Sequence, residues 1–231
     1  MTRLLNILLI ALCGFGVAGA RTIKVNTGDF HTLKVFDDLQ VIYNADPQKA
    51  GTAEYECDER YADALMFTVN GTDLKIQVAP DFLGREDELP VIYVYSNRLQ
   101  NVESSSTKKV EINRLPACPE FRAILMDNGS IDINNLEATK VVAKILSGHG
   151  TINISGKTPD AVLELTGTGT IRANNLIANK VSCHVFGTGE IFCTPLDEIK
   201  LKGLGTTRVY YTGNPAKVKK HGLGKLIHVG D

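Results

Sequence analysis

The acidic side chains that could carry out catalysis lie on short stretches of alternating apolar and polar residues. Asp132, Glu164 and Glu190 take outward positions there, and Arg172 lies two repeats after Asp132 at an equivalent position. Clustered carboxylates with a basic partner would suit cleavage of a polysaccharide. The repeat between Asp132 and Arg172 offers only Asn153. Because adjacent repeats of such a structure lie about 4.8 Å apart, the pair would be separated by roughly twice that distance. We therefore predict a solvent-exposed face, no catalytic residues and no enzyme, with a glycan-active enzyme as the alternative.

The sequence also contains no pattern typical of a metal site or of a catalytic nucleophile. His184 adjoins Cys183, but neighbouring residues of a strand point to opposite faces. Calcium-binding solenoids repeat Gly-Gly-x-Gly-x-Asp, and that Asp is missing here. Ser147, Ser155 and Ser182 have no recognisable histidine and acid partners. We predict no metal ion and no cofactor, since no ligand spacing joins the five histidines, which are His31, His149, His184, His221 and His228.

The first twenty residues indicate export. Arg3 precedes the mainly apolar run 4–17, and Ala18-Gly19-Ala20 is a typical cleavage pattern. We predict a signal peptide over 1–20 and a protein of the periplasm, the outer membrane surface or the medium. Cys13 follows the bulky Leu12, which argues against a lipid-modified cysteine. No later segment has the length and apolarity of a transmembrane helix.

Four cysteines follow the predicted signal peptide: Cys57, Cys118, Cys183 and Cys193. Export permits disulfides, and three pairings are possible. Cys183 and Cys193 alternate with apolar neighbours, so we expect both to point into the core as small hydrophobic residues. A Cys183–Cys193 disulfide is the alternative.

The amino-acid composition limits the classes of partner that the chain is expected to bind. The net charge is −1 with interspersed signs, and the chain has no Trp and few aromatic residues. No basic face for nucleic acid is expected, and the case for an aromatic sugar-binding platform is weak.

A repeat organises the second half of the chain. Gly-x-Gly followed by a polar and then an apolar residue recurs with a period near twenty, the length of one coil of a β-solenoid. Asn134-Asn135-Leu136 also recurs forty positions later as Asn174-Asn175-Leu176. We expect structural corners at the second glycine of each marker: Gly129, Gly150, Gly169, Gly189, Gly205 and Gly224. There glycine would allow a positive φ, with Asn128 as a tolerated substitute for the first glycine of its marker.

The alternating residues around each marker predict short strands with one buried face. Stacked coils would place Ile131, Ile152, Ile171 and Ile191 in one interior column. We therefore predict an all-β fold, a right-handed parallel β-helix or solenoid with coils of about twenty residues. An antiparallel β-sandwich with glycine-rich hairpins is the alternative.

The first half, 21–117, is less regular and is expected to be a β-rich part that caps the repeat region 118–231. Asn70-Gly71-Thr72-Asp73 between two apolar runs predicts a hairpin. Residues 99–102 and 110–112 are consistent with a degenerate first coil, with 104–106 (Ser-Ser-Ser) at its corner, and 59–65 with one helical turn.

The order of these motifs resembles the bacterial family named putative auto-transporter adhesin, head GIN domain. The matching residues are 36–41 (FDDLQV), 54–57, 69–76 (VNGTDLKI), 94–102 (VYSNRLQNV), the Gly-x-Gly coils and 210–215 (YYTGNP). The resemblance implies one continuous domain over about 34–215, an exported β-helical protein of Bacteroidetes-like bacteria, and no catalytic residues.

These observations favour a non-enzymatic cell-envelope or surface protein that binds a partner through an extended face. The partner would be a glycan or a cell-surface protein, and a purely structural envelope role is the alternative. Asn and Thr on the outer faces could hydrogen-bond a glycan, although stacking of asparagines along the coils explains them as well. A basic cluster near the end would either keep other strands from pairing with the terminal edge of the sheet or bind an acidic glycan or lipid head group. Its residues are Lys217, Lys219, Lys220 and Lys225.

Overall fold

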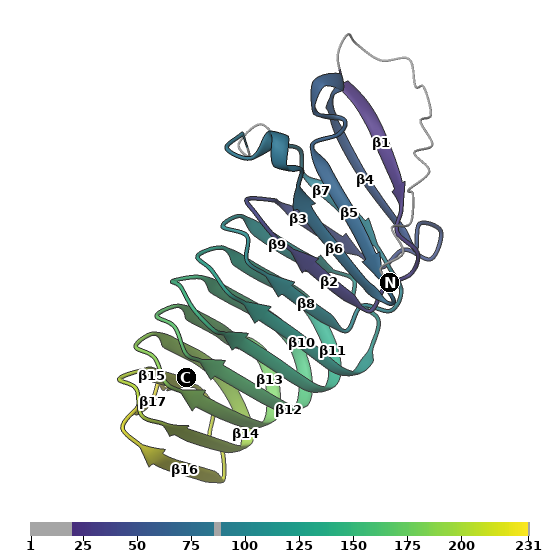
Figure 1. Cartoon of the computed structure of the whole chain (residues 1–231). Coiled ribbons are helices and arrows are strands. Elements are labelled where there is room, and N and C mark those ends of the chain that lie inside the picture. The colour runs from purple at the N-terminus through teal and green to yellow at the C-terminus, as the bar shows by residue number, and fades with distance from the viewer. Residues whose placement is uncertain (1–19, 86–88, 231) are drawn as a thin grey trace.

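The structure is a computed structural model that describes residues 20–85 and 89–230. The predicted signal peptide, 1–20, lies outside the described residues except for Ala20. The described residues form an elongated stack of strands joined by short turns (Figure 1). The strands are β1 (Ala20–Asn26), β2 (Thr32–Val35), β3 (Val41–Asn44), β4 (Thr52–Asp58), β5 (Leu65–Asn70), β6 (Asp73–Val78), β7 (Ile92–Tyr95), β8 (Asn101–Ser104), β9 (Lys109–Asn113), β10 (Cys118–Leu125), β11 (Ser130–Ile145), β12 (Thr151–Leu165), β13 (Thr170–Val185), β14 (Glu190–Gly203), β15 (Arg208–Tyr211), β16 (Lys217–Gly222) and β17 (Lys225–His228).

The long strands β11 to β14 each bend around most of one coil and pair with the next coil in parallel. Ile131 pairs with Ile152, which pairs with Ile171, which in turn pairs with Ile191. All four side chains are fully buried. The predicted interior column and the solenoid fold are therefore confirmed, and the antiparallel sandwich is wrong. Each buried isoleucine contributes roughly 1.5–3 kcal/mol, but only once a neighbouring coil covers it.

Two sheets run the length of the stack and share one interior. The first sheet contains β3, β9, the N-terminal halves of β11 to β14, β15 and β17. The second contains β2, β8, β10, the C-terminal halves of β11 to β14, and β16. Residues alternate along each strand, so every second side chain faces outward, and outward side chains of successive coils form columns. These columns are the surfaces on which a binding site can be built.

The expected first coil is present, with serines at its corner. β8 pairs in parallel with β10, and β9 pairs in parallel with β11. Ser104 and Ser106 are buried, and the Ser106 hydroxyl donates to the Leu39 carbonyl at 2.9 Å and accepts from the Lys108 amide at 3.0 Å. The buried hydroxyls satisfy backbone groups at this turn.

An earlier coil, β2 and β3, packs against β8 and β9 although β4 to β7 intervene in sequence. Beyond it, β5 and β6 form the predicted hairpin through Gly71-Thr72, and β1 and β4 pair antiparallel. A 3-10 turn at Glu59–Tyr61 matches the expected helical turn. We propose on this arrangement that 21–117 caps the repeat region 118–231.

The positive φ expected at the marker glycines is present at Gly148 and Gly222, the first glycines of their markers, but not at the second glycines. None of the six corner glycines has a positive φ, and neither does Asn128. At Gly129, Gly150, Gly169, Gly189 and Gly205, an added Cβ would instead overlap a backbone oxygen of the preceding coil. At Gly224 the nearest atom would be 3.2 Å away. We propose that these positions serve as corners because the backbones of successive coils approach too closely for a side chain.

Candidate functional site

Two adjacent outward columns on the first sheet form a surface that we call the polar face. In the first column Ser130 pairs with Thr151, and Thr151 with Thr170. In the second, Asp132 pairs with Asn153, and Asn153 with Arg172. The parallel register thus places six hydrogen-bonding side chains on three successive coils, with a coil spacing of about 4.8 Å.

The hydroxyl column is free to meet a ligand. Within the part of the chain that the structure describes, the hydroxyls of Ser130, Thr151 and Thr170 form no hydrogen bond to protein. Each of the three side chains is only partly buried. A row of hydroxyls that no protein group satisfies can donate to and accept from a bound molecule.

In the second column, some side chains hydrogen-bond to one another. Asn153 Nδ2 donates to Asp132 Oδ1 at 2.6 Å, and Lys109 Nζ lies 3.9 Å from Asp132 Oδ2. Asn134 Nδ2 similarly donates to Asn113 Oδ1 at 2.8 Å. Stacking along the coils therefore accounts for these asparagines in part, as one of the two interpretations predicted.

An aromatic stack closes the C-terminal end of the polar face. The rings of Phe192 and Tyr210 are nearly parallel, with centroids 4.9 Å apart, and the Arg172 guanidinium carbon lies 5.3 Å from the Phe192 centroid. Arg172 and Tyr210 come from the coils on either side of Phe192, so both ring faces are covered. The stack therefore fixes Arg172 at the rim of the face.

The aromatic content of the sequence did not predict this aromatic stack. The low aromatic content argues against an aromatic feature, but Phe192 directly follows the apolar Ile191 and Tyr210 directly follows the apolar Val209, on successive coils. That shared position in the repeat was the signal available in the sequence.

The three predicted outward acids, Asp132, Glu164 and Glu190, do not form a catalytic pair with one another. Asp132 and Arg172 lie two coils apart with Asn153 between them, as predicted. Glu164 lies on the second sheet and pairs with Lys144 at 2.8 Å, whereas Glu190 pairs with Arg208 at 3.5 Å. Glu164 is on a different sheet from the other two, and Asp132 and Glu190 lie three coils apart on the first sheet, too far for the paired carboxylates of glycosidic cleavage.

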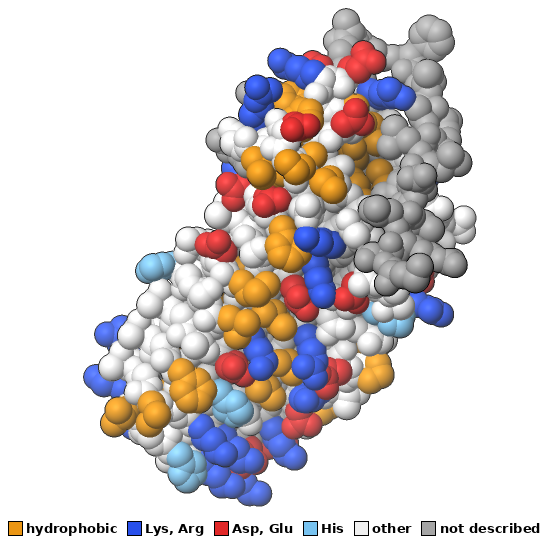
Figure 2. Space-filling model, viewed as in Figure 1, with side chains coloured by type: hydrophobic (Ala, Val, Ile, Leu, Met, Phe, Trp, Pro, Cys, Tyr) orange, Lys and Arg blue, Asp and Glu red, His pale blue; other side chains and the backbone are white. Residues whose placement is uncertain are grey.

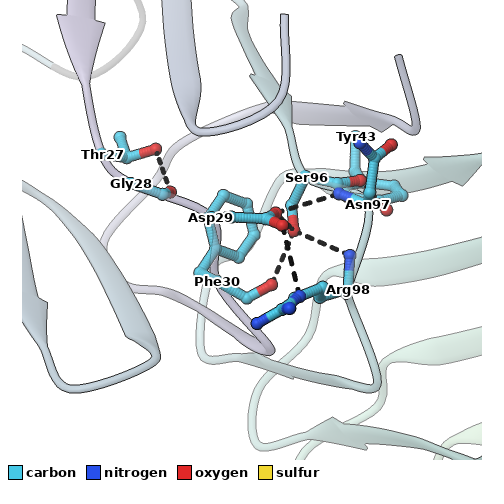
Figure 3. Close-up of polar contacts among 8 residues, drawn as sticks. All are labelled: Thr27, Gly28, Asp29, Phe30, Tyr43, Ser96, Asn97 and Arg98. Atoms are coloured by element: carbon cyan, nitrogen blue, oxygen red, sulfur yellow. Dashed lines mark hydrogen bonds and ion pairs between the residues drawn. The ribbon is translucent and has the colours of Figure 1, made fainter. Parts of the chain in front are cut away.

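A buried polar cluster lies near the N-terminal end of the stack (Figure 3). The Ser96 hydroxyl lies 2.6 Å from Asp29 Oδ1 and 2.6 Å from the Phe30 carbonyl, and accepts from the Arg98 amide at 3.1 Å. Tyr43 donates to the Ser96 carbonyl at 2.5 Å, and burial followed by the Asp29 charge raises the pKa of Tyr43 well above its ordinary value. Ser96 is fully buried, and its hydroxyl hydrogen-bonds to Asp29, Phe30 and Arg98. The cluster therefore ties the segment before β2 to the segment that leads into β8.

A shallow groove of about 470 Å³ runs along the third side of the coils. Its walls are mostly small or apolar, and an exposed ion pair of 2.5 Å between Glu137 and Lys157 lies at its rim. Burial raises the pKa of the Cys118 thiol, which also lines the groove. A thiol with a raised pKa carries little thiolate near neutral pH and is a poor nucleophile.

The remaining cysteines lie in the interior. Cys183 and Cys193 are buried, as predicted, and all four cysteines are free thiols in the structure. Contact with Cys193, followed by burial, raises the pKa of Cys183. Among residues 20–85 and 89–230, no three His, Cys, Asp or Glu side chains form a group that could hold a metal ion. No helix in the described part of the chain is long and apolar enough to cross a membrane.

Comparison with known proteins supports the architecture. The family model described as putative auto-transporter adhesin, head GIN domain, matches residues 29–215. A search of curated proteins finds no significant match. The crystal structure of a putative adhesin from Bacteroides fragilis is similar, with a TM-score of 0.81, 19% identity, and coverage of 92% of this chain and 98% of that chain.

Two further structures share the fold. A putative lipid binding protein from Parabacteroides distasonis has a TM-score of 0.72 and 18% identity, over 93% of this chain and 98% of that chain. A putative adhesin from Parabacteroides merdae has a TM-score of 0.66 and 18% identity, over 93% of this chain and 96% of that chain.

Proposed function

The chain belongs to the family described as putative auto-transporter adhesin, head GIN domain, and from that premise we propose that it is an exported, non-enzymatic protein whose polar face binds carbohydrate. The observation that carries this proposal is the column of free hydroxyls at Ser130, Thr151 and Thr170 beside Asp132, Asn153 and Arg172. The protein acts in the periplasm, at the outer membrane surface or in the medium.

The chemistry of the face suits a sugar polymer. Sugar hydroxyls donate and accept hydrogen bonds, and so do the threonine hydroxyls and the Asn153 amide. Arg172 adds a fixed planar donor at one end. Since the donors and acceptors recur on each coil, an extended chain can bind through repeated equivalent contacts.

Rigidity supports binding as well. The face is built on stacked strands whose interior isoleucines are fully buried, so little conformational freedom is lost on binding. Adhesin names in the family and among the similar structures agree with a binding role without chemistry.

A glycan array tests the proposal. The wild-type protein is compared with a Thr151→Val/Thr170→Val double variant, which removes two hydroxyls and keeps β-branched side chains that suit a strand. The matched control is Thr139→Val, an exposed threonine that lines the groove on the third side.

We expect wild type and Thr139→Val to bind the same glycans and the double variant to bind at least about fivefold more weakly, because each lost hydrogen bond costs about 0.5–1.5 kcal/mol. Binding lost only in Thr139→Val would place the ligand in the groove. Absence of binding to any glycan would refute the carbohydrate assignment.

A further inference from the structure

The last coils carry a strong positive charge that the whole chain does not share. Residues 198–225 contain six lysines and one arginine against a single acid, Glu198, which is a net charge of +6. The net charge of the entire chain is only −1. Figure 2 shows Lys and Arg side chains gathered at this end of the molecule, with histidine and hydrophobic side chains beside them.

Most of these lysines have no acidic partner. Glu198 Oε1 lies between Lys219 at 3.0 Å and Lys200 at 3.4 Å, so one carboxylate serves two ammonium groups. In the part of the chain that the structure describes, no ion pair joins the other four, which are Lys202, Lys217, Lys220 and Lys225. The positive charge of this surface therefore attracts anions more strongly than is needed only to keep other strands from pairing with the terminal edge.

An apolar column lies beside these lysines. Phe186, Leu204 and Leu223 each follow the last strand residue of the second sheet on three successive coils. Their amides hydrogen-bond to the preceding coil at 2.8, 3.1 and 3.0 Å, which keeps the three in register. Their side chains are 58%, 73% and 70% exposed.

The basic and apolar side chains lie close together in the chain on each of these coils. His184, Lys202 and His221 form one outward column, and each stands two residues before a member of the apolar column. Both columns follow the register of successive coils and therefore run alongside each other through the last coils, although Gly222, with a φ of +99°, interrupts the extended backbone between His221 and Leu223. Lys225 stands two residues after Leu223, at the start of β17, where it pairs with Arg208 of the preceding coil.

We propose that this surface, formed by Phe186, Leu204 and Leu223 with Lys202 and Lys225, docks the protein on the anionic surface of a phospholipid bilayer. Apolar side chains enter the boundary between head groups and acyl chains, while the flanking lysines meet the lipid phosphates. An acidic polysaccharide would satisfy the charge but would leave the three large apolar side chains in water. Lys225 continues the column of Ser130, Thr151 and Thr170 and lies three coils beyond Thr170, so on the first sheet the docking surface starts beyond the C-terminal end of the polar face.

Vesicle sedimentation with the purified protein tests the proposal. The probes are vesicles of phosphatidylcholine alone and vesicles of phosphatidylcholine with phosphatidylglycerol. The variants are Leu204→Ser/Leu223→Ser and Lys202→Gln/Lys225→Gln, all at exposed positions, and thermal unfolding checks that each folds as wild type does. The controls are Ile177→Ser, 51% exposed in the groove, and Lys24→Gln/Lys157→Gln, which changes the net charge equally.

We expect the wild type to bind the vesicles that contain phosphatidylglycerol, to release them at high salt, and to bind phosphatidylcholine alone poorly. Both test variants should lose binding by ~tenfold or more, and both controls should bind as wild type does. Equal binding to both kinds of vesicle, or unchanged binding by either test variant, would overturn the proposal. So would the absence of vesicle binding, because the partner would then be something other than a bilayer.

Discussion

Lys220 occupies, in the last coil, the interior position that Leu201 holds in the coil before it. The interior column of the second sheet runs through Leu163, Cys183 and Leu201, all fully buried, and then meets this lysine. Every residue of β16 is exposed. A charged side chain at an apolar interior position prevents another strand from adding to this open edge.

Replacing this lysine should therefore promote self-association. We expect Lys220→Leu to form dimers or larger species at concentrations where the wild type does not, because the apolar column would continue to the end of the stack. Lys217→Leu is the matched control, since Lys217 lies in an outward column of the same strand. Sedimentation velocity gives the species present, and a Lys220→Leu variant that matches wild type at all concentrations would contradict the assignment.

The corner glycines should differ in their tolerance of alanine. Gly189→Ala should lower the free energy of unfolding by about 3 kcal/mol or more, because the Cβ would overlap the Gly169 carbonyl oxygen and force the coils apart. Gly224→Ala should cost well under half of that, since its nearest neighbour would be 3.2 Å away. Urea unfolding measures both values. Equal costs would show that close approach is not what selects glycine.

The buried cluster around Ser96 should contribute to stability. Tyr43→Phe removes the hydroxyl that donates to the Ser96 carbonyl, and leaving that buried acceptor unpaired should cost about 1–3 kcal/mol. Tyr93→Phe, at a side chain that is 41% exposed, should change the free energy of unfolding by less than about 0.5 kcal/mol. If Tyr43→Phe unfolds as wild type does, the hydrogen bond is not part of what joins the two segments.

The thiols should react slowly and in a fixed order. Burial raises the pKa of Cys118, so its thiolate fraction at pH 8 is smaller than that of an ordinary cysteine and rises only at higher pH. Alkylation of native protein should therefore modify Cys118 slowly, faster at pH 9.5 than at pH 8, and leave Cys183 unmodified because it is fully buried. Mass spectrometry of digested protein identifies the modified residues. Rapid reaction of Cys118 at pH 7 would contradict the raised pKa.

The repeat made the fold of the second half predictable. A periodic sequence places like residues at like positions, so the register of Ile131, Ile152, Ile171 and Ile191 could be read from spacing alone. The order of the first coils could not, because β3 pairs with β9 across the whole of β4 to β7 and no repeat marks that pairing. Local periodicity carries no information on such distant contacts.

The sites were predictable to a similar extent. The column of Asp132, Asn153 and Arg172 follows directly from equivalent positions in the repeat. The closing stack of Phe192 and Tyr210 was missed because composition counts residues without placing them. The close approach of backbones at the second marker glycines could not be predicted, because the distance between neighbouring backbones is a property of the stack and not of any single turn.

Hydrogen exchange of the backbone amides gives the most direct test of the polar face as a binding surface. The protein is measured alone and with the glycan that it binds most tightly on the array. We expect slower exchange on binding at 130–133, 151–154 and 170–173, the segments that carry the two columns, and unchanged exchange at 137–139 and 157–159 beside the groove. Protection confined to the groove, or protection at none of these segments, would contradict the account.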